Sequence, residues 1–101
     1  MWIFVFFDLP TETKKDRRNA QQFRKALLQD GFTMMQYSVY HRHCASGESA
    51  DVHERRIKNL LPPKGYVSIL RITDKQYGNI MNYWGIHREK PRISPQQLEI
   101  F

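Results

Sequence analysis

The sequence predicts an α+β fold built as strand, helix, strand, strand, helix, strand. Three observations predict it: a continuously apolar start over positions 1–7, two segments with helical apolar spacing, and β-prone segments between and after them. A chain of 101 residues can bury one modest core, so we expect one compact unit with a C-terminal extension.

The first strand is expected over Met1–Phe7, which is apolar at every position and rich in aromatic and β-branched residues. Such a run is typical of a strand buried on both faces, so it should be central in its sheet. Pro10 ends it, because proline cannot donate to a strand ladder and holds Leu9 extended.

The first helix is expected to begin near Lys14, because Thr13 and Asp16 have the spacing of a capping box. Asp30-Gly31 is a helix-stop signal. Between these limits an apolar stripe faces the core and a basic face lies opposite. The stripe contains Ala20, Phe23 and Leu27, and the basic face contains Lys14, Arg17, Arg18, Arg24 and Lys25.

The segment Phe32–Cys44 is β-prone throughout but too long for one strand, so we expect two strands with a break near Gln36–Ser38. A second helix should follow the loop at 46–49 and run to about Leu61, before Pro62-Pro63. One face of this helix is expected to carry Ala50, His53, Ile57, Leu60 and Leu61.

The C-terminal third predicts a mostly buried strand over Tyr66–Thr73, a capped helical turn over Thr73–Gly78 and a further short strand over Ile80–Trp84. We therefore divide the chain into a domain over 1–88 and a docking tail over 89–101. The tail alternates polar and apolar residues, which predicts that it docks on a partner through Leu98, Ile100 and Phe101.

This order of elements is the ferredoxin-like βαββαβ arrangement, with both helices on one face of an antiparallel sheet and an additional C-terminal strand region. The other face of the sheet is then bare and rich in aromatic residues. A bare apolar face predicts a homodimer formed through the sheet.

Charge and cysteine content narrow the function classes. Sixteen Lys and Arg against ten Asp and Glu give a net charge of +6, which favours a polyanionic partner such as nucleic acid. No apolar run approaches the roughly 20 residues of a membrane span, so we expect no membrane association. The single cysteine, Cys44, excludes an intrachain disulfide and fits a reducing, cytoplasmic setting.

Asp8 is the candidate for chemistry, because it is a lone carboxylate directly after an apolar strand. One interpretation is a turn residue that satisfies backbone donors. The other is a ligand for a hard cation such as Mg²⁺, which two such carboxylates could share across a two-fold axis.

The basic residues have two interpretations as well. They are either a solvated helix face or a surface that holds nucleic-acid backbone, and the preference for Arg over Lys favours phosphate contacts. The candidates are Lys14, Arg17, Arg18, Arg24 and Arg42. His41 and His43 would share one face of a strand beside Cys44; we expect them to be ordinary sheet-surface residues rather than metal ligands or a general base.

Several segments resemble CRISPR-associated protein 2, the small subunit of the spacer-acquisition complex. The resemblance lies in Phe4–Pro10 (FVFFDLP), Asp30-Gly31-Phe32 after an Arg-rich helix, and Gln36–Tyr40 (QYSVY). The ending, Tyr83-Trp84-Gly85 through Pro95–Phe101, is similar to the form found in type II systems.

This resemblance implies a ferredoxin-like homodimer in which the last strand completes the partner's sheet. Asp8 would match the aspartate that binds Mg²⁺ at the dimer axis of a metal-dependent endonuclease acting on single-stranded RNA or double-stranded DNA. Arg17 and Arg18 would match helix-start residues that contact DNA, and the tail from Pro95 would dock on the integrase subunit, CRISPR-associated protein 1. The family often has an acidic or aromatic residue where this chain has His41, so no role is carried over to it.

The resemblance implies that the endonuclease also bridges two integrase dimers and binds the DNA to be integrated. Two other functions remain open from the sequence. The chain could instead be a non-catalytic scaffold that has this bridging role alone. It could also be a related toxin-type ribonuclease, which would need no integrase partner.

Overall fold

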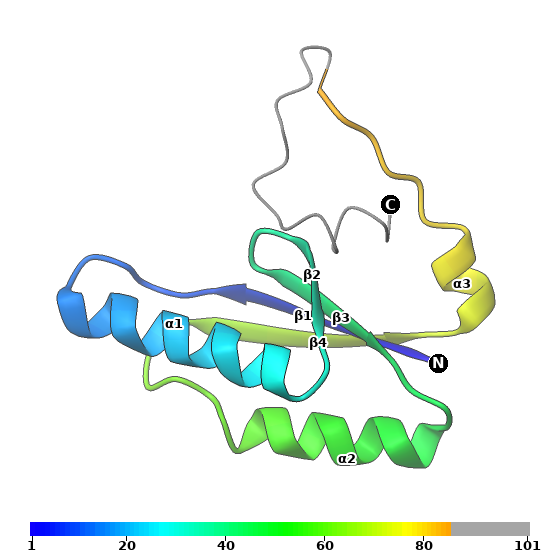
Figure 1. Ribbon diagram of the computed structural model, residues 1–101, viewed down its shortest axis with the longest axis horizontal. Coiled ribbons are helices and arrows are strands. Elements are labelled where there is room, and N and C mark those ends of the chain that lie inside the picture. Colours follow the sequence, from blue (N-terminus) through cyan, green and yellow to red (C-terminus); the bar gives the residue numbers. More distant parts are fainter. Residues whose placement is uncertain (86–101) are drawn as a thin grey trace.

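The computed structural model describes residues 1–85 and has the predicted order of strands and helices (Figure 1). Two long helices and a short one are joined by the strands of one sheet. In chain order the elements are β1 (Trp2–Asp8), α1 (Lys14–Gln29), β2 (Thr33–Gln36), β3 (Val39–His43), α2 (Gly47–Lys58), β4 (Tyr66–Ile72) and α3 (Asp74–Gly78).

The sheet is four-stranded and antiparallel in the order β2-β3-β1-β4. β1 is therefore central, as its apolar sequence predicts, and pairs with β3 on one side and β4 on the other. The ferredoxin-like α+β fold is confirmed for the described chain. Side chains alternate between the two faces of a strand, so β1 contributes to both a helix-covered face and an opposite face.

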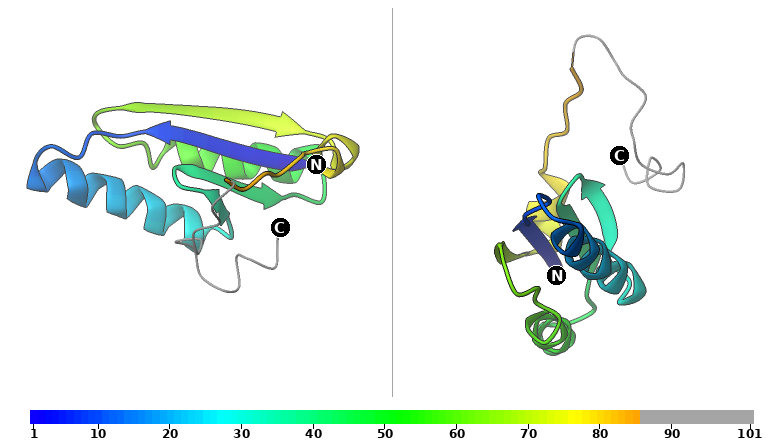
Figure 2. Two further views of the ribbon diagram at one scale, coloured as in Figure 1. Left: turned by 90° about the horizontal axis from the view of Figure 1, so that it is seen from above. Right: turned by 90° about the vertical axis from the view of Figure 1, so that its left-hand side faces the viewer.

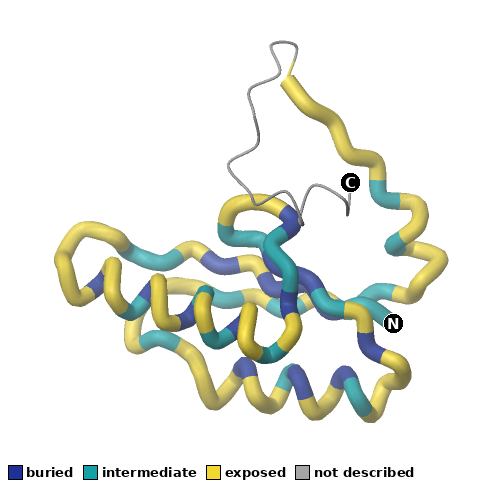
Figure 3. Tube along the Cα trace, in the orientation of Figure 1, coloured by how far each residue is buried: buried dark blue, intermediate teal, exposed yellow. Residues whose placement is uncertain are grey.

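The hydrophobic core lies between the sheet and the two long helices, which both pack on the same face (Figures 1 and 2). Figure 3 shows that buried positions recur along the inner sides of α1 and α2. Because every second residue of β1 faces the helices, the core combines one alternating set with two helical stripes. Its members include Ile3, Val5, Phe7, Phe23, Leu27, Ala50 and Ile57.

The start of α1 and the break in the hairpin both follow the sequence signals. The Thr13 hydroxyl accepts from the Asp16 amide and the Asp16 carboxylate accepts from the Thr13 amide, so the capping box is complete. The break between β2 and β3 lies at Tyr37–Ser38, where Ser38 has the left-handed φ of 66°. The Phe7 amide donates to the Ser38 carbonyl at 3.1 Å, which fixes this turn against β1.

The end of α1 is fastened to α2 and β3 through Asp30. His53 Nδ1 lies 2.7 Å and Arg56 Nη1 2.8 Å from the two Asp30 carboxylate oxygens, and Arg42 donates to the Asp30 carbonyl at 2.7 Å. Burial by itself would raise the pKa of Asp30, but the hydrogen bonds from His53 and Arg56 outweigh it and hold the pKa below its usual 3.8. The carboxylate therefore stays ionised and joins the two helices.

One prediction about burial and one about the end of a helix are wrong. β4 was expected to be mostly buried, yet it is an edge strand and none of its residues is fully buried. The second helix ends at Lys58, so Leu60 and Leu61 follow it and remain 42% and 50% exposed. In both cases the residues are apolar, but no segment of the described chain covers them.

The strand expected over Ile80–Trp84 does not form. Within residues 1–85, no strand follows β4. The Ile80 amide instead donates to the Tyr77 carbonyl and closes α3. A strand needs a neighbour with free backbone groups, and no strand of the described chain pairs with this segment.

The short helix α3 packs on the sheet face opposite α1 and α2 and buries a histidine. The Tyr77 ring stacks on Trp2 at 3.6 Å between centroids, and His41 stacks on Trp2 and Phe4. His41 is only 2% exposed, so our expectation of a sheet-surface histidine is wrong. Its pKa falls to about 4 because burial penalises the imidazolium.

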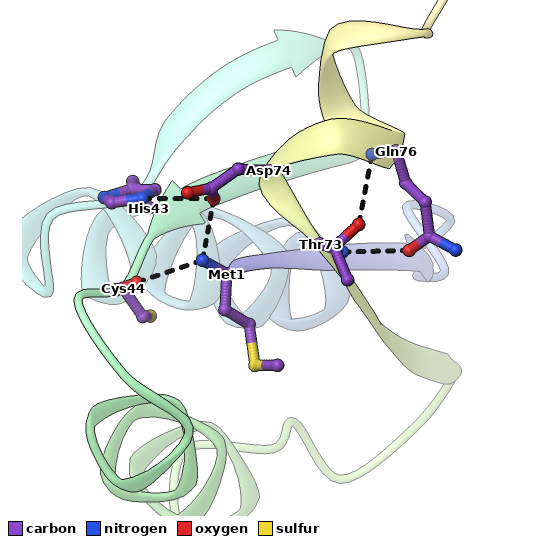
Figure 4. A network of polar contacts seen from close by, with 6 residues as sticks. All are labelled: Met1, His43, Cys44, Thr73, Asp74 and Gln76. Carbon is purple, nitrogen blue, oxygen red and sulfur yellow. Dashed lines mark hydrogen bonds and ion pairs between the residues drawn. The ribbon is translucent and has the colours of Figure 1, made fainter.

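α3 is tied down by a polar network that Figure 4 shows from close by. Thr73 and Gln76 form a second capping box. The Asp74 carboxylate accepts from the Met1 amino group at 2.7 Å and lies 3.3 Å from His43 Nε2. The hydrogen bond from the amino group is the main cause that lowers the pKa of Asp74. This network joins the start of β1 to the end of β4.

Two predictions concern residues that the structure does not describe. The boundary between residues 88 and 89 and the docking tail over 89–101, with Leu98, Ile100 and Phe101, lie outside the described range. Among the helices of residues 1–85, none combines the length and the apolar character that crossing a bilayer requires.

Candidate metal and nucleic-acid site

Asp8 is the last residue of β1 and its side chain is exposed. It lies directly opposite Tyr66 in the antiparallel β1–β4 ladder, and it shares a face of β1 with Phe6, the face opposite the helices. Gly65 passes close beneath it: a Cβ there would lie 2.7 Å from the Asp8 carbonyl oxygen, and the φ of Gly65 is +99°. The strand pairing and this close approach together fix the backbone from which the carboxylate projects.

An open hollow of about 340 Å³ lies beside Asp8. Its lining comes from three parts of the chain: the end of β1, the β2–β3 turn and the start of β4. Its polar groups are one carboxylate and several hydroxyl groups, and its other walls are aromatic and aliphatic. The polar residues that line it are Asp8, Tyr37, Ser38, Tyr66 and Ser68.

The oxygen atoms of the hollow are of the type that a hard cation prefers as ligands, but the described residues that line it bring too few carboxylates to hold one. Carboxylate and hydroxyl oxygens are the ligands that Mg²⁺ accepts, whereas the hollow offers no imidazole or thiolate. Among residues 1–85, no group of three His, Cys, Asp or Glu side chains lies close enough to hold a metal ion. Within the described part of the chain, the lining of the hollow therefore contains one carboxylate, that of Asp8.

Three of the five candidate basic residues lie exposed at the start of α1: Lys14, Arg17 and Arg18. Arg17 Nη1 donates to the carbonyl oxygens of Thr11 and Glu12 at 3.0 and 3.3 Å. These bonds to the preceding loop restrain the Arg17 guanidinium while its other donors stay accessible. Cationic side chains with free donors at a fixed position are suited to holding phosphate groups.

Arg24 occupies a different environment, half-buried between α1 and the hollow. Its guanidinium carbon lies 5.6 Å from the Phe7 ring centroid and 4.8 Å from that of Tyr37. Burial raises the pKa of Tyr40, and the charge of Arg24 partly opposes that rise. Arg24 thus supports the wall of the hollow rather than extending the exposed basic surface.

Arg42 lies at the opposite end of α1 and is held there by Asp30. A Cβ at Gly31 would overlap the Arg42 guanidinium, so the side chain fills the space that glycine leaves. Since α1 rises about 1.5 Å per residue, roughly 20 Å separates Asp30 from Arg17. The structure therefore does not bring Arg42 together with the basic residues at the helix start.

Two tyrosines of the hollow, Tyr37 and Tyr66, were not among the candidate site residues predicted from the sequence. Tyr37 was treated only as part of a β-prone segment and Tyr66 only as the start of a buried strand. Their joint position depends on the register that places Tyr66 opposite Asp8. The one local signal for Tyr37 in the sequence was its position, as an aromatic residue, within the predicted strand break.

Comparisons with known proteins agree with this fold. Residues 1–80 match the family described as CRISPR associated protein Cas2. A protein of Parvibaculum lavamentivorans named CRISPR-associated endoribonuclease Cas2 is 54% identical over 101 residues, covering all of both chains. One of the same name from Flavobacterium psychrophilum is 52% identical, covering 100% of this chain and 88% of that one.

A solved structure is similar as well. The crystal structure of Streptococcus pyogenes Cas2 at pH 6.5 superimposes with a TM-score of 0.61, covering 82% of this chain and 99% of that one at 19% identity. At that identity the likeness supports the fold alone. The family match and the close relatives go further, and the chain belongs to the CRISPR associated protein Cas2 family.

Proposed function

We propose that this protein is a Mg²⁺-dependent endonuclease subunit of CRISPR adaptation that acts as a homodimer. The observation that carries the proposal is the position of Asp8: an exposed carboxylate at the end of the central strand, beside a hollow lined by hydroxyl groups. The relatives' name, endoribonuclease, supports the same reaction class. RNA and DNA both carry the phosphodiester group that such a site would cleave.

The proposed homodimer is supported by the apolar surface of the sheet face opposite α1 and α2. Beside the part that α3 covers lies an apolar hollow of about 480 Å³, lined by side chains from all four strands and α3. Phe6 and Leu70 in this region are 37% and 49% exposed. Covering these side chains with a second copy removes apolar surface from water and brings a second Asp8 into the assembly.

In this mechanism the side chains of the protein bind and position the scissile phosphodiester. One Asp8 from each subunit would hold Mg²⁺, which when bound acidifies water and stabilises charge on the phosphate. Lys14, Arg17 and Arg18 hold the flanking backbone by charge-assisted hydrogen bonds. Because these contacts read phosphate and not bases, binding depends little on sequence.

The decisive experiment replaces Asp8 by Asn in the purified protein. Cleavage of single-stranded RNA and double-stranded DNA in Mg²⁺ is expected to fall more than about a hundredfold, since the amide loses the charge that holds the metal. Glu48→Gln, an exposed change in the first turn of α2, is the matched control. Cleavage by Asp8→Asn at the parental rate would place the activity elsewhere.

A second candidate function is a scaffold that bridges integrase dimers and binds DNA. Two observations favour it: the hollow is lined by only one carboxylate of the described chain, and the cations at the start of α1 are exposed. Replacing Arg17 and Arg18 by Ala should then weaken DNA binding and reduce the slope of log affinity against log salt by about 2.

Deleting Pro95–Phe101 should abolish spacer acquisition and capture of the integrase while the dimer persists. Unimpaired acquisition would contradict tail docking, and failure to capture any integrase would favour the toxin-type ribonuclease.

A further inference from the structure

Two exposed tyrosines flank the hollow beside Asp8. Tyr37 at the β2–β3 turn is 73% exposed, and Tyr66 at the start of β4 is 80% exposed. They flank the end of β1, Tyr37 from the β2–β3 turn and Tyr66 from β4, and line the same space of about 340 Å³. Large aromatic rings kept in water beside a polar group are suited to stacking against a planar ligand.

The Tyr37 ring is held in place before any ligand binds. The Arg24 guanidinium covers one face of it, with its carbon 4.8 Å from the ring centroid. The turn beneath it is fixed by the left-handed Ser38 and by the hydrogen bond from the Phe7 amide to the Ser38 carbonyl. One face of the ring is thus supported while most of its surface stays open, which lowers the entropy cost of stacking.

The Tyr66 ring is placed by strand register. Tyr66 and Asp8 are directly opposite in the β1–β4 ladder, so their side chains leave the same face of the sheet with Cβ atoms about 5 Å apart. A phosphate held at the Asp8 carboxylate through a metal would therefore have its own nucleotide within reach of this ring. The Ser38 and Ser68 hydroxyl groups on the same hollow are available to base or sugar edges.

We infer that Tyr37 and Tyr66 form an aromatic clamp that stacks on an unpaired nucleobase of the strand whose phosphate lies at Asp8. This inference rests on the proposed nuclease function and names the feature of the substrate that the site selects. Bases within a duplex already stack on each other, so the clamp favours single strands. The exposed helix-start cations contact phosphates of either form and give no such preference.

Binding without metal tests the clamp separately from cleavage. In EDTA, a short single-stranded RNA carrying a fluorescent adenine analogue, the same RNA annealed to its complement, and the corresponding single-stranded DNA are titrated with the protein. Tyr37→Leu and Tyr66→Leu are each expected to weaken single-strand binding about fivefold or more and to reduce the quenching that stacking causes. Duplex binding should change less than about twofold.

Three controls make each outcome decisive. Tyr37→Phe keeps the ring and should bind like the parent, and Tyr83→Leu changes an equally exposed tyrosine, 82% exposed, that does not line the hollow. Light scattering on the same samples reports the oligomeric state. Unchanged single-strand affinity and quenching, equal losses with duplex, or a change of oligomeric state in the Leu variants would each overturn the clamp.

The outcomes also separate the clamp from the nuclease proposal. Persistent cleavage by Asp8→Asn would overturn the nuclease function and leave the metal-free binding result unaffected. Normal single-strand binding by the Leu variants, together with loss of cleavage in Asp8→Asn, would overturn the clamp alone.

Discussion

The two ends of the sheet face opposite α1 and α2 are built differently. At the Trp2 end, which we call the closed end, α3 covers the strands, Tyr77 stacks on Trp2, and His41 is buried. At the Asp8 end, the open end, a carboxylate and two tyrosines stay exposed around a hollow. On this face of the sheet, stacked and buried aromatic side chains lie at one end of β1, and exposed polar and aromatic groups lie at the other. Substitutions at the two ends should therefore separate folding from function.

The largest expected effect contrasts two aromatic side chains. Trp2→Ala at the closed end should lower the free energy of unfolding by about 3 kcal/mol, because it removes the ring that stacks on Tyr77 and His41. Tyr66→Ala at the open end should change it by less than about 0.5 kcal/mol, since the side chain is 80% exposed. Urea denaturation of both variants measures the difference. Equal losses of unfolding free energy would contradict the contrast between the closed and open ends.

The next effect is the pH dependence that His41 gives to the closed end. Its pKa is about 4 in the folded protein and near 6.5 in the unfolded chain, so the unfolded state takes up the proton first. The contribution of neutral His41 to the free energy of unfolding is therefore complete above pH 6.5 and is lost as pH falls toward 4. At about 1.4 kcal/mol per pKa unit, the loss is about 3 kcal/mol in total. The pKa of Asp30 lies below 3.8, so its contribution is lost at lower pH.

Unfolding measured between pH 7 and pH 4 tests this assignment. In His41→Leu the slope over that range should nearly disappear. His43→Gln, a change at an exposed neighbour on the same strand, should retain it. A slope unchanged in His41→Leu would show that another group titrates there.

The smallest expected effect concerns one hydroxyl at the closed end. The Tyr77 hydroxyl lies 3.4 Å from His41 Nδ1, a long contact for a hydrogen bond. Tyr77→Phe keeps the stacked ring and should cost less than about 1 kcal/mol. A much larger loss in urea denaturation would mean that the polar contact, and not the stacked rings, holds α3 on the sheet.

The sequence predicted the parts of the fold that local patterns control. The capping box at Thr13 placed the start of α1, the uninterrupted apolar run predicted the central strand, and the excess length of 32–44 predicted the hairpin. Asp8 was predicted as a candidate ligand because it is a lone carboxylate directly after a seven-residue apolar run. Its role as a ligand stays a prediction.

The remaining features depend on contacts between distant segments. His41 is buried only because Tyr77 of α3 packs against it. Arg42 donates to the Asp30 carbonyl only because Gly31 leaves room for the guanidinium. Neither contact leaves a periodic pattern in the sequence. The register that pairs Tyr66 with Asp8 is equally non-local, which is why the aromatic part of the hollow was missed.

The close passage of Gly65 under Asp8 has a practical consequence for studying this protein. A methyl group at position 65 would press on the backbone of Asp8 and Leu9 and would be strained at a φ of +99°. Gly65→Ala is thus a means of shifting the carboxylate while leaving every polar, aromatic and cationic side chain of the hollow in place. Such a variant separates the geometry of this corner from its chemical composition, which replacement of Asp8 itself cannot do.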